Sequence, residues 1–125
     1  MVRGNIIAHC KHAGIVGGLG GAFSRIESNR IRSIHVRCPF GEAEMSGIKL
    51  HGAIDTGIRR NHFHDYSRGL GVDWMAQGTR LTQNLFRDHA PSEDVSVEAD
   101  PGPFLVATNV FLSPTKVRDI PEGGA

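Results

Sequence analysis

The chain has 125 residues, the usual size of one domain, and this length can bury a core without a disulfide or a metal ion. Its 14 basic and 13 acidic side chains give a formal net charge of +1, and the two signs are interspersed along the sequence. This pattern excludes a polyanion-binding tail, so we expect no nucleic-acid partner. Glycine is abundant, with 16 residues, and it favours turns over long helices.

The sequence that follows Met1 has no apolar signal segment, and no run approaches the roughly 20 apolar residues that span a bilayer. We therefore expect a cytoplasmic or other intracellular protein that makes no membrane contact. In that compartment Cys10 and Cys38 would be reduced. A disulfide between them is the open alternative, if the strands that flank them pair.

The first half of the chain alternates predicted strands with one predicted helix. Short apolar and β-branched runs predict a strand at 5–9. Apolar side chains spaced three and four residues apart predict a short helix over 22–29. Apolar and polar residues then alternate at 31–38 and at 48–55, and this alternation predicts two further strands.

The second half begins with a long polar segment at 56–71, which we interpret as a loop. A strand is predicted at 72–76. Residues 79–89 fit either a helix or a strand, and the helix is preferred because Pro stops the pattern directly afterwards. Strands at 95–98 and 104–112, separated by a turn, predict a β-hairpin.

Together these elements predict one α+β domain over residues 1–125. It would be mainly an antiparallel β-sheet or barrel with one or two short helices. Residues 113–125 would form an extended C-terminal arm, because proline and glycine are frequent there. We expect no internal repeat, and no segment has the composition of an interdomain linker.

A histidine pair makes the first candidate site. His62 and His64 are two residues apart, so in a strand they lie on one side and can present both imidazoles to one metal ion. Asp65 or His89 would support the pair. The site would hold a divalent transition metal such as zinc or iron in a β-barrel enzyme, and the alternative is ordinary exposed histidines.

A glycine-rich loop makes the second candidate site. Gly17, Gly18, Gly20 and Gly21 precede the predicted helix, where free backbone N–H groups and the helix dipole bind anions. This segment resembles the acyl-CoA-pyrophosphate loop of the GNAT acetyltransferases. The resemblance implies anion or acyl-CoA binding at the loop, with Arg25 near the phosphate. The alternative is a tight turn without a ligand.

No serine or cysteine has the setting of an activated nucleophile, so the sequence gives no complete catalytic motif. Three functions stay open. The first is a homo-oligomeric structural or assembly protein, favoured by the glycine-rich leading segment and the extended arm. The second is a metal-dependent enzyme that uses the histidine pair, and the third is a protein that binds an anion or acyl-CoA.

Overall fold

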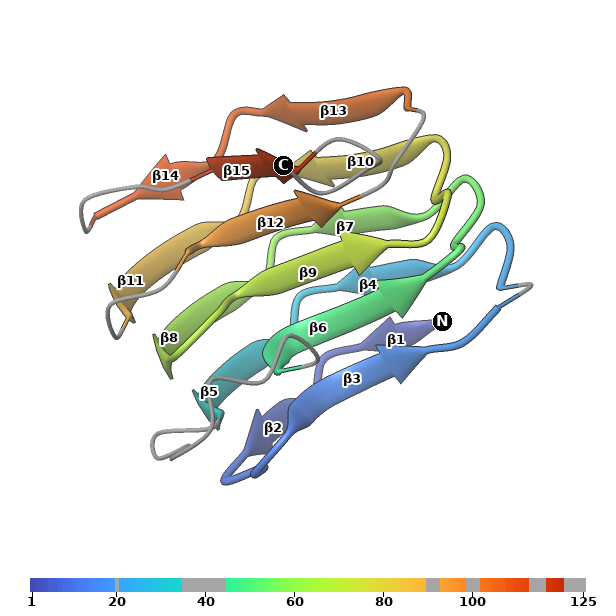
Figure 1. The fold of residues 1–125 in the computed structure, drawn as a ribbon. Helices are drawn as coiled ribbons and strands as arrows, with labels where there is room; N and C mark the ends of the chain where they lie inside the picture. Colours follow the sequence, from blue (N-terminus) through green and yellow to red (C-terminus); the bar gives the residue numbers. More distant parts are fainter. Residues whose placement is uncertain (20, 35–44, 90–92, 99–101, 113–116, 121–125) are drawn as a thin grey trace.

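The chain coils through three parallel sheets and forms a β-solenoid, or parallel β-helix (Figure 1). The structure is a computed structural model, and it describes residues 1–19, 21–34, 45–89, 93–98, 102–112 and 117–120. Each turn of the solenoid places one strand in each sheet, so every strand inside a sheet pairs with the strands one turn before and one turn after it.

The three sheets have five strands each, and the strands within every sheet are parallel. Sheet A contains β1 (Val2–Arg3), β4 (Arg25–Glu27), β7 (Gly57–Arg59), β10 (Thr79–Thr82) and β13 (Phe104–Ala107). Sheet B contains β2 (Ile6–Ala8), β5 (Arg30–Ile34), β8 (His62–Tyr66), β11 (Leu85–His89) and β14 (Val110–Phe111). Sheet C contains β3 (Ala13–Gly17), β6 (Ser46–His51), β9 (Leu70–Asp73), β12 (Val95–Glu98) and β15 (Val117–Ile120).

A sequence repeat underlies these turns. An asparagine stands at the corner between sheets A and B in every turn, and an apolar residue follows it two positions later. These asparagines are Asn5, Asn29, Asn61, Asn84 and Asn109. Successive ones are 24, 32, 23 and 25 residues apart. The expectation of no internal repeat is therefore wrong, because a repeat of 20 to 50 residues is the signature of a solenoid.

The asparagines form a hydrogen-bonded ladder along the solenoid axis. Asn61 is buried, and its Oδ1 accepts hydrogen bonds from the backbone N–H and the Nδ2 of Asn29, both at 3.0 Å. Its Nδ2 donates to the Oδ1 of Asn84 at 3.0 Å and to the carbonyl of Ile26 at 2.9 Å. The amide of Asn61 thus binds the corner of the preceding turn and the asparagine of the following turn, so it joins three successive turns.

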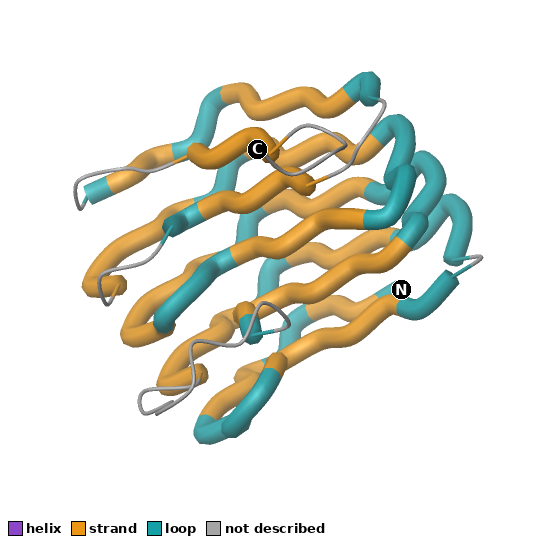
Figure 2. The backbone as a smooth tube through the Cα atoms, in the orientation of Figure 1, coloured by secondary structure: helices purple, strands orange, loops and turns teal. Residues whose placement is uncertain are grey.

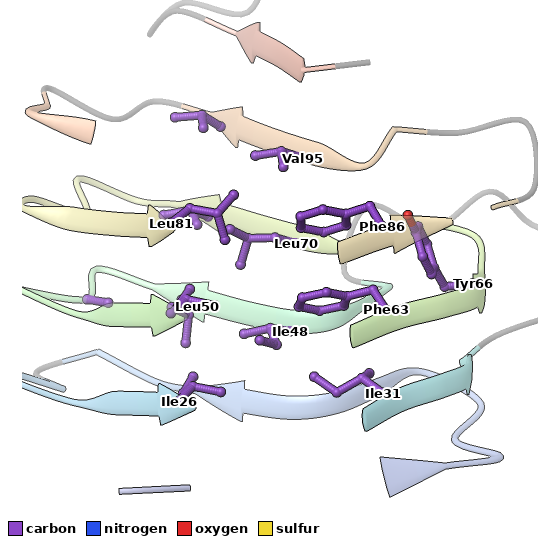
Figure 3. Close-up of a cluster of buried hydrophobic side chains, with 14 of the residues drawn as sticks. Ile26, Ile31, Ile48, Leu50, Phe63, Tyr66, Leu70, Leu81, Phe86 and Val95 are labelled. Atoms are coloured by element: carbon purple, nitrogen blue, oxygen red, sulfur yellow. The ribbon is translucent and has the colours of Figure 1, made fainter. Parts of the chain in front are cut away.

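The interior of the solenoid is filled by columns of stacked side chains (Figure 3). Phe63 stacks on Phe86 with ring centroids 4.6 Å apart, and Phe86 stacks on Phe111 at 5.0 Å. Ile31 continues this column as the register neighbour of Phe63. A second column, on the sheet C side, contains Ile48, Leu70 and Val95. Repetition of apolar residues at the same position of each turn therefore makes a continuous core.

The described residues contain no helix, and hence none that could cross a membrane (Figure 2). The helix predicted over 22–29 is wrong, because that segment contains β4. The preferred helix at 79–89 is also wrong, because those residues form β10 and β11 around a left-handed residue, Gln83, with φ at 58°. The apolar residues of these segments have helix-like spacing because a short strand, a corner and a second strand follow one another within a few residues.

The predicted hairpin is also wrong. β12 belongs to sheet C and pairs with β9, whereas β13 belongs to sheet A and pairs with β10. The chain turns a corner between them instead of reversing. The predicted α+β class and the antiparallel sheet or barrel are therefore replaced by an all-parallel solenoid. The strand predicted at 5–9 is confirmed as β2, and the one at 48–55 overlaps β6.

Substitution of Asn61 by alanine tests the ladder. We expect the free energy of unfolding to fall by about 2–4 kcal/mol, because buried partners on Asn29 and Asn84 lose their hydrogen bonds. Urea unfolding followed by circular dichroism measures this loss. Asn5→Ala is the matched control at the exposed start of the ladder, and its loss should be much smaller. An equal loss of unfolding free energy in the two variants would show that an interior asparagine contributes no more to stability than the exposed one.

Candidate functional site

A group of charged and polar side chains, two of them buried, lies on the outer face of sheet C, where β6, β9 and β12 end (Figure 1). Leu70 and Val72 of β9 are buried in the core, so the alternation of a strand turns Asp73 outward. His51 and Glu98 are the register neighbours of Asp73 on either side. Three polar side chains therefore stand in a row, with their strands about 4.8 Å apart.

Asp73 is held by two basic side chains. Only 5% of Asp73 is exposed, and its Oδ2 lies 2.9 Å from the Nζ of Lys49, which is itself buried. The other oxygen, Oδ1, lies 2.5 Å from the Nδ1 of His51 but has no aligned hydrogen-bond donor among the described residues. Lys49 therefore neutralises a carboxylate that would be costly to bury alone, and Oδ1 faces the imidazole of His51.

A cavity of about 450 Å³ opens beside this carboxylate and is lined by Gly18, Leu19, His51 and Trp74. Its size is typical of a small-molecule site. Trp74 follows Asp73 directly, takes a left-handed φ of 58° at the corner, and is 66% exposed. Leu19 is exposed as well. The cavity therefore has an apolar and aromatic lining, and His51 is the lining residue that contacts Asp73.

The structure separates the residues of the predicted anion loop. Gly17 ends β3, Gly18 lines the cavity, and Gly21 lies at the start of the corner that leads to sheet A, while Gly20 lies outside the described residues. Arg25 belongs to β4 in sheet A, and the helix expected after the loop is a strand. The helix dipole on which the GNAT resemblance depends is therefore missing from this segment.

The histidine pair faces outward from sheet B. The rings of His62 and His64 have their centroids 4.9 Å apart, as the two-residue spacing predicts. The Nε2 of His62 accepts a hydrogen bond from the Nε of Arg87 at 2.9 Å, and the Nε2 of His64 accepts one from the Nε of Arg30 at 3.3 Å. These acceptor nitrogens face arginines, whose positive charge opposes a metal cation.

The other predicted ligands lie apart from the histidine pair. Asp65 lies within β8 with a left-handed φ of 56° and accepts a hydrogen bond from the Oγ of Ser33. His89 is the register neighbour of Tyr66, at the opposite end of β8 from His62. Within the described part of the chain no cluster of histidine, cysteine, aspartate or glutamate could hold a metal ion. The described residues therefore give no support for the zinc or iron site, and the role of His62, His64, Asp65 and His89 as ligands stays a prediction.

The reasons for expecting an assembly protein also change. The glycine-rich leading segment contains β3, which pairs with β6, and residues 117–120 of the predicted arm form β15, which pairs with β12. Both segments are turns of one solenoid, so neither supports an oligomeric or structural role. Of the two cysteines, Cys10 is a free thiol that donates to the carbonyl of Ala8, and Cys38 lies outside the described residues.

A second buried polar group marks the corner between sheets B and C. The hydroxyl of Tyr66 donates a short hydrogen bond to Asp94, and burial together with this carboxylate raises the pKa of Tyr66 far above its usual value. Glu93 binds Arg68 at 3.2 Å and Arg118 at 2.9 Å. These pairs are satisfied by one another and join successive turns, which is a structural role.

The same fold occurs in a solved chain named XylC, whose structure was determined in complex with xylose. The two chains are 45% identical and superpose with a TM-score of 0.84. The match covers 98% of this chain and 19% of that chain, so the present chain spans about a fifth of the length of XylC. No protein-family model and no curated protein matches the chain.

The histidine pair predicts a stability that depends on pH. Burial lowers the pKa of His62 and His64 below the usual 6.5, and nearby arginines lower it further. His64 also lowers the pKa of His62. Below about pH 6.5 the unfolded chain therefore binds more protons than the folded chain at these sites, and acidification toward the lower folded-state pKa reduces the free energy of unfolding. The loss should be smaller in a double variant, His62→Gln with His64→Gln.

Urea unfolding at about pH 7.5 and about pH 5.5 measures this difference. His9→Asn is the control, because His9 is exposed and its φ of 59° suits asparagine. A double variant with the same dependence on pH as the unmodified chain would contradict the assignment to His62 and His64.

Proposed function

We propose that this chain binds a xylose-type sugar at the outer face of sheet C and contributes the two carboxylates that cleave its glycosidic bond. The observation that carries the proposal is the register match of Asp73 with Glu98 on successive turns, beside the exposed indole of Trp74. The identity of 45% with a chain solved in complex with xylose supports the choice of sugar.

The spacing of the two carboxylates favours one stereochemical course. Register neighbours in a parallel sheet stand about 4.8 Å apart and point to the same face. Retaining glycosidases have carboxyl groups about 5–5.5 Å apart, whereas inverting ones need about 6.5–9.5 Å to admit a water molecule. Asp73 and Glu98 match the shorter spacing, so we expect the product to keep the configuration of the substrate.

Asp73 suits the role of nucleophile. Lys49 stabilises its negative charge, and Oδ1 is the oxygen without an aligned donor among the described residues. In the first step Oδ1 forms a bond to the anomeric carbon while the bond from that carbon to the leaving oxygen breaks. Glu98 supplies the proton that the leaving oxygen takes.

The second step restores both carboxyl groups. Glu98, now ionised, accepts a proton from a water molecule, and the resulting oxygen displaces Asp73 from the anomeric carbon. Glu98 is half-buried, and the described residues place no cation against it. Asp73, in contrast, has the ammonium group of Lys49 against its Oδ2, so we assign the nucleophile role to Asp73 and the acid and base role to Glu98.

The cavity supplies the binding energy for the sugar. The face of a pyranose ring presents C–H groups that pack well on an indole, and Trp74 offers an exposed one. Leu19 adds apolar area at the same cavity, while His51 brings a polar ring to the edge where Asp73 lies. A neutral monosaccharide with one apolar face fits this arrangement.

Two substitutions test the proposed chemistry with aryl xylosides of either anomeric form. Asp73→Asn should reduce hydrolysis by about 10³-fold or more for every leaving group, because it removes the nucleophile. Glu98→Gln should cost about 10²–10⁴-fold for a poor leaving group and much less for an activated one such as dinitrophenol, because that group needs no proton. Product anomers followed by nuclear magnetic resonance should show retention.

Asp65→Asn is the matched control, since it makes the same chemical change at an exposed position of sheet B. Its rate should equal that of the unmodified chain. Full activity of Asp73→Asn, or an inverted product, would refute the assigned roles. Binding of xylose is measured separately by titration: Trp74→Ala should abolish it, and a chain that binds xylose equally well without Trp74 would refute the location of the site.

A further inference from the structure

A second cavity, of about 310 Å³, opens on the outer face of sheet A, and neither Asp73 nor Glu98 lines it. Its lining is polar and contains three arginines, Arg25, Arg59 and Arg80. The proposed sugar cleavage makes no use of these side chains. A ligand of this cavity must therefore suit several guanidinium groups.

The floor of this cavity is a glycine between two arginines. Gly57 in β7 is the register neighbour of Arg25 in β4 on one side and of Arg80 in β10 on the other. The next residue in each strand is apolar and buried, so these three positions face outward. The two arginines are therefore two strand spacings apart, about 10 Å, with no side chain between them.

Gly57 has room for a side chain that it does not carry. A Cβ added there would meet no atom within 4 Å outside its chain neighbours, so the packing of the fold does not require glycine at this position. Its backbone φ is also outside the left-handed region. The missing side chain instead leaves a slot between the guanidinium groups of Arg25 and Arg80.

The charges in the slot leave one arginine uncompensated. The Nε of Arg59 binds the Oε1 of Glu27 at 3.0 Å, and Arg80 forms an ion pair with Asp55. Over the described residues, no carboxylate pairs with Arg25. Three arginines against two carboxylates leave the cavity with an excess positive charge. The arginines of sheet B differ, because Arg30 and Arg87 donate to histidine rings there.

We propose that this slot binds an oxyanion group of a small ligand, a carboxylate or a phosphate, between Arg25 and Arg80. A guanidinium carries five N–H donors in a planar fork, so Arg80 can keep its bond to Asp55 and still donate to the anion. Phe23 lines the same cavity and is 74% exposed, and it offers an apolar surface to the rest of the ligand.

Two probes separate the sources of the oxyanion: glucuronate, an acidic sugar, and inorganic phosphate. Each is titrated into the unmodified chain at low salt and followed by nuclear magnetic resonance, with glucose as the neutral control. Saturable binding of at least one anion, with none of glucose, is the expected result. The anion that binds identifies the ligand class, and failure of both at about 10 mM would overturn the proposal.

Two variants locate the anion. Arg25→Gln should weaken binding at least about tenfold, because it removes the uncompensated charge. Gly57→Val should abolish binding without any change of charge, because the branched side chain fills the slot. Valine suits a strand and has space here, so the variant should fold, and thermal unfolding verifies this. Wild-type affinity in either variant would place the anion elsewhere and overturn the proposal.

Two controls keep this inference separate from the sugar site. Arg60→Gln removes an exposed arginine whose Nε donates to the side chain of Gln83, and it should bind the anion as the unmodified chain does. An equal loss of affinity in Arg60→Gln would show a general charge effect and overturn the slot. Asp73→Asn should also bind the anion normally, so failure of the sugar proposal leaves this test intact.

Discussion

The asparagine ladder is the constraint on which the other features of this chain depend. Each interior amide forms hydrogen bonds with the turn before it and with the turn after it. These bonds fix the spacing between successive turns and hold the backbone at their corners. A slip of one residue would turn every core side chain outward, because strand residues alternate between two faces. The ladder thereby preserves the register that aligns Asp73 with Glu98, and Gly57 with Arg25 and Arg80.

Part of this fold could be predicted from local sequence, and part could not. A short apolar and β-branched run correctly locates β2, and alternating apolar residues overlap β6, because both patterns are properties of a single strand. Direction and pairing are properties of two strands about one turn apart, and no local pattern carries them. The repeat gives only a weak signal in the sequence, because its spacing varies from 23 to 32 residues. The repeated residues are mainly one asparagine and one apolar residue per turn.

The candidate sites, too, could be predicted only in part from local sequence. The pair His62 and His64 is visible in the sequence and does share one face, but its arginine partners come from strands on neighbouring turns. Asp73 has no catalytic motif around it in the sequence, since its partners Lys49, His51 and Glu98 also lie on other turns. Only the asparagine repeat, read as a solenoid, could have aligned these residues beforehand.

In a solenoid, the number of turns between two residues at the same strand position sets the distance between them. This distance determines which chemistry the outer surface can support. Groups on adjacent turns are separated by one strand spacing, about 4.8 Å, which is close to the spacing of a carboxylate nucleophile and a carboxylic acid that act on one glycosidic bond. Groups two turns apart are separated by about twice that distance, which leaves room for an anion between Arg25 and Arg80 only if the intervening residue is small. Gly57 meets that condition without any requirement from packing. The outer faces can therefore change function by single substitutions, while the asparagines and the stacked core keep the spacing constant.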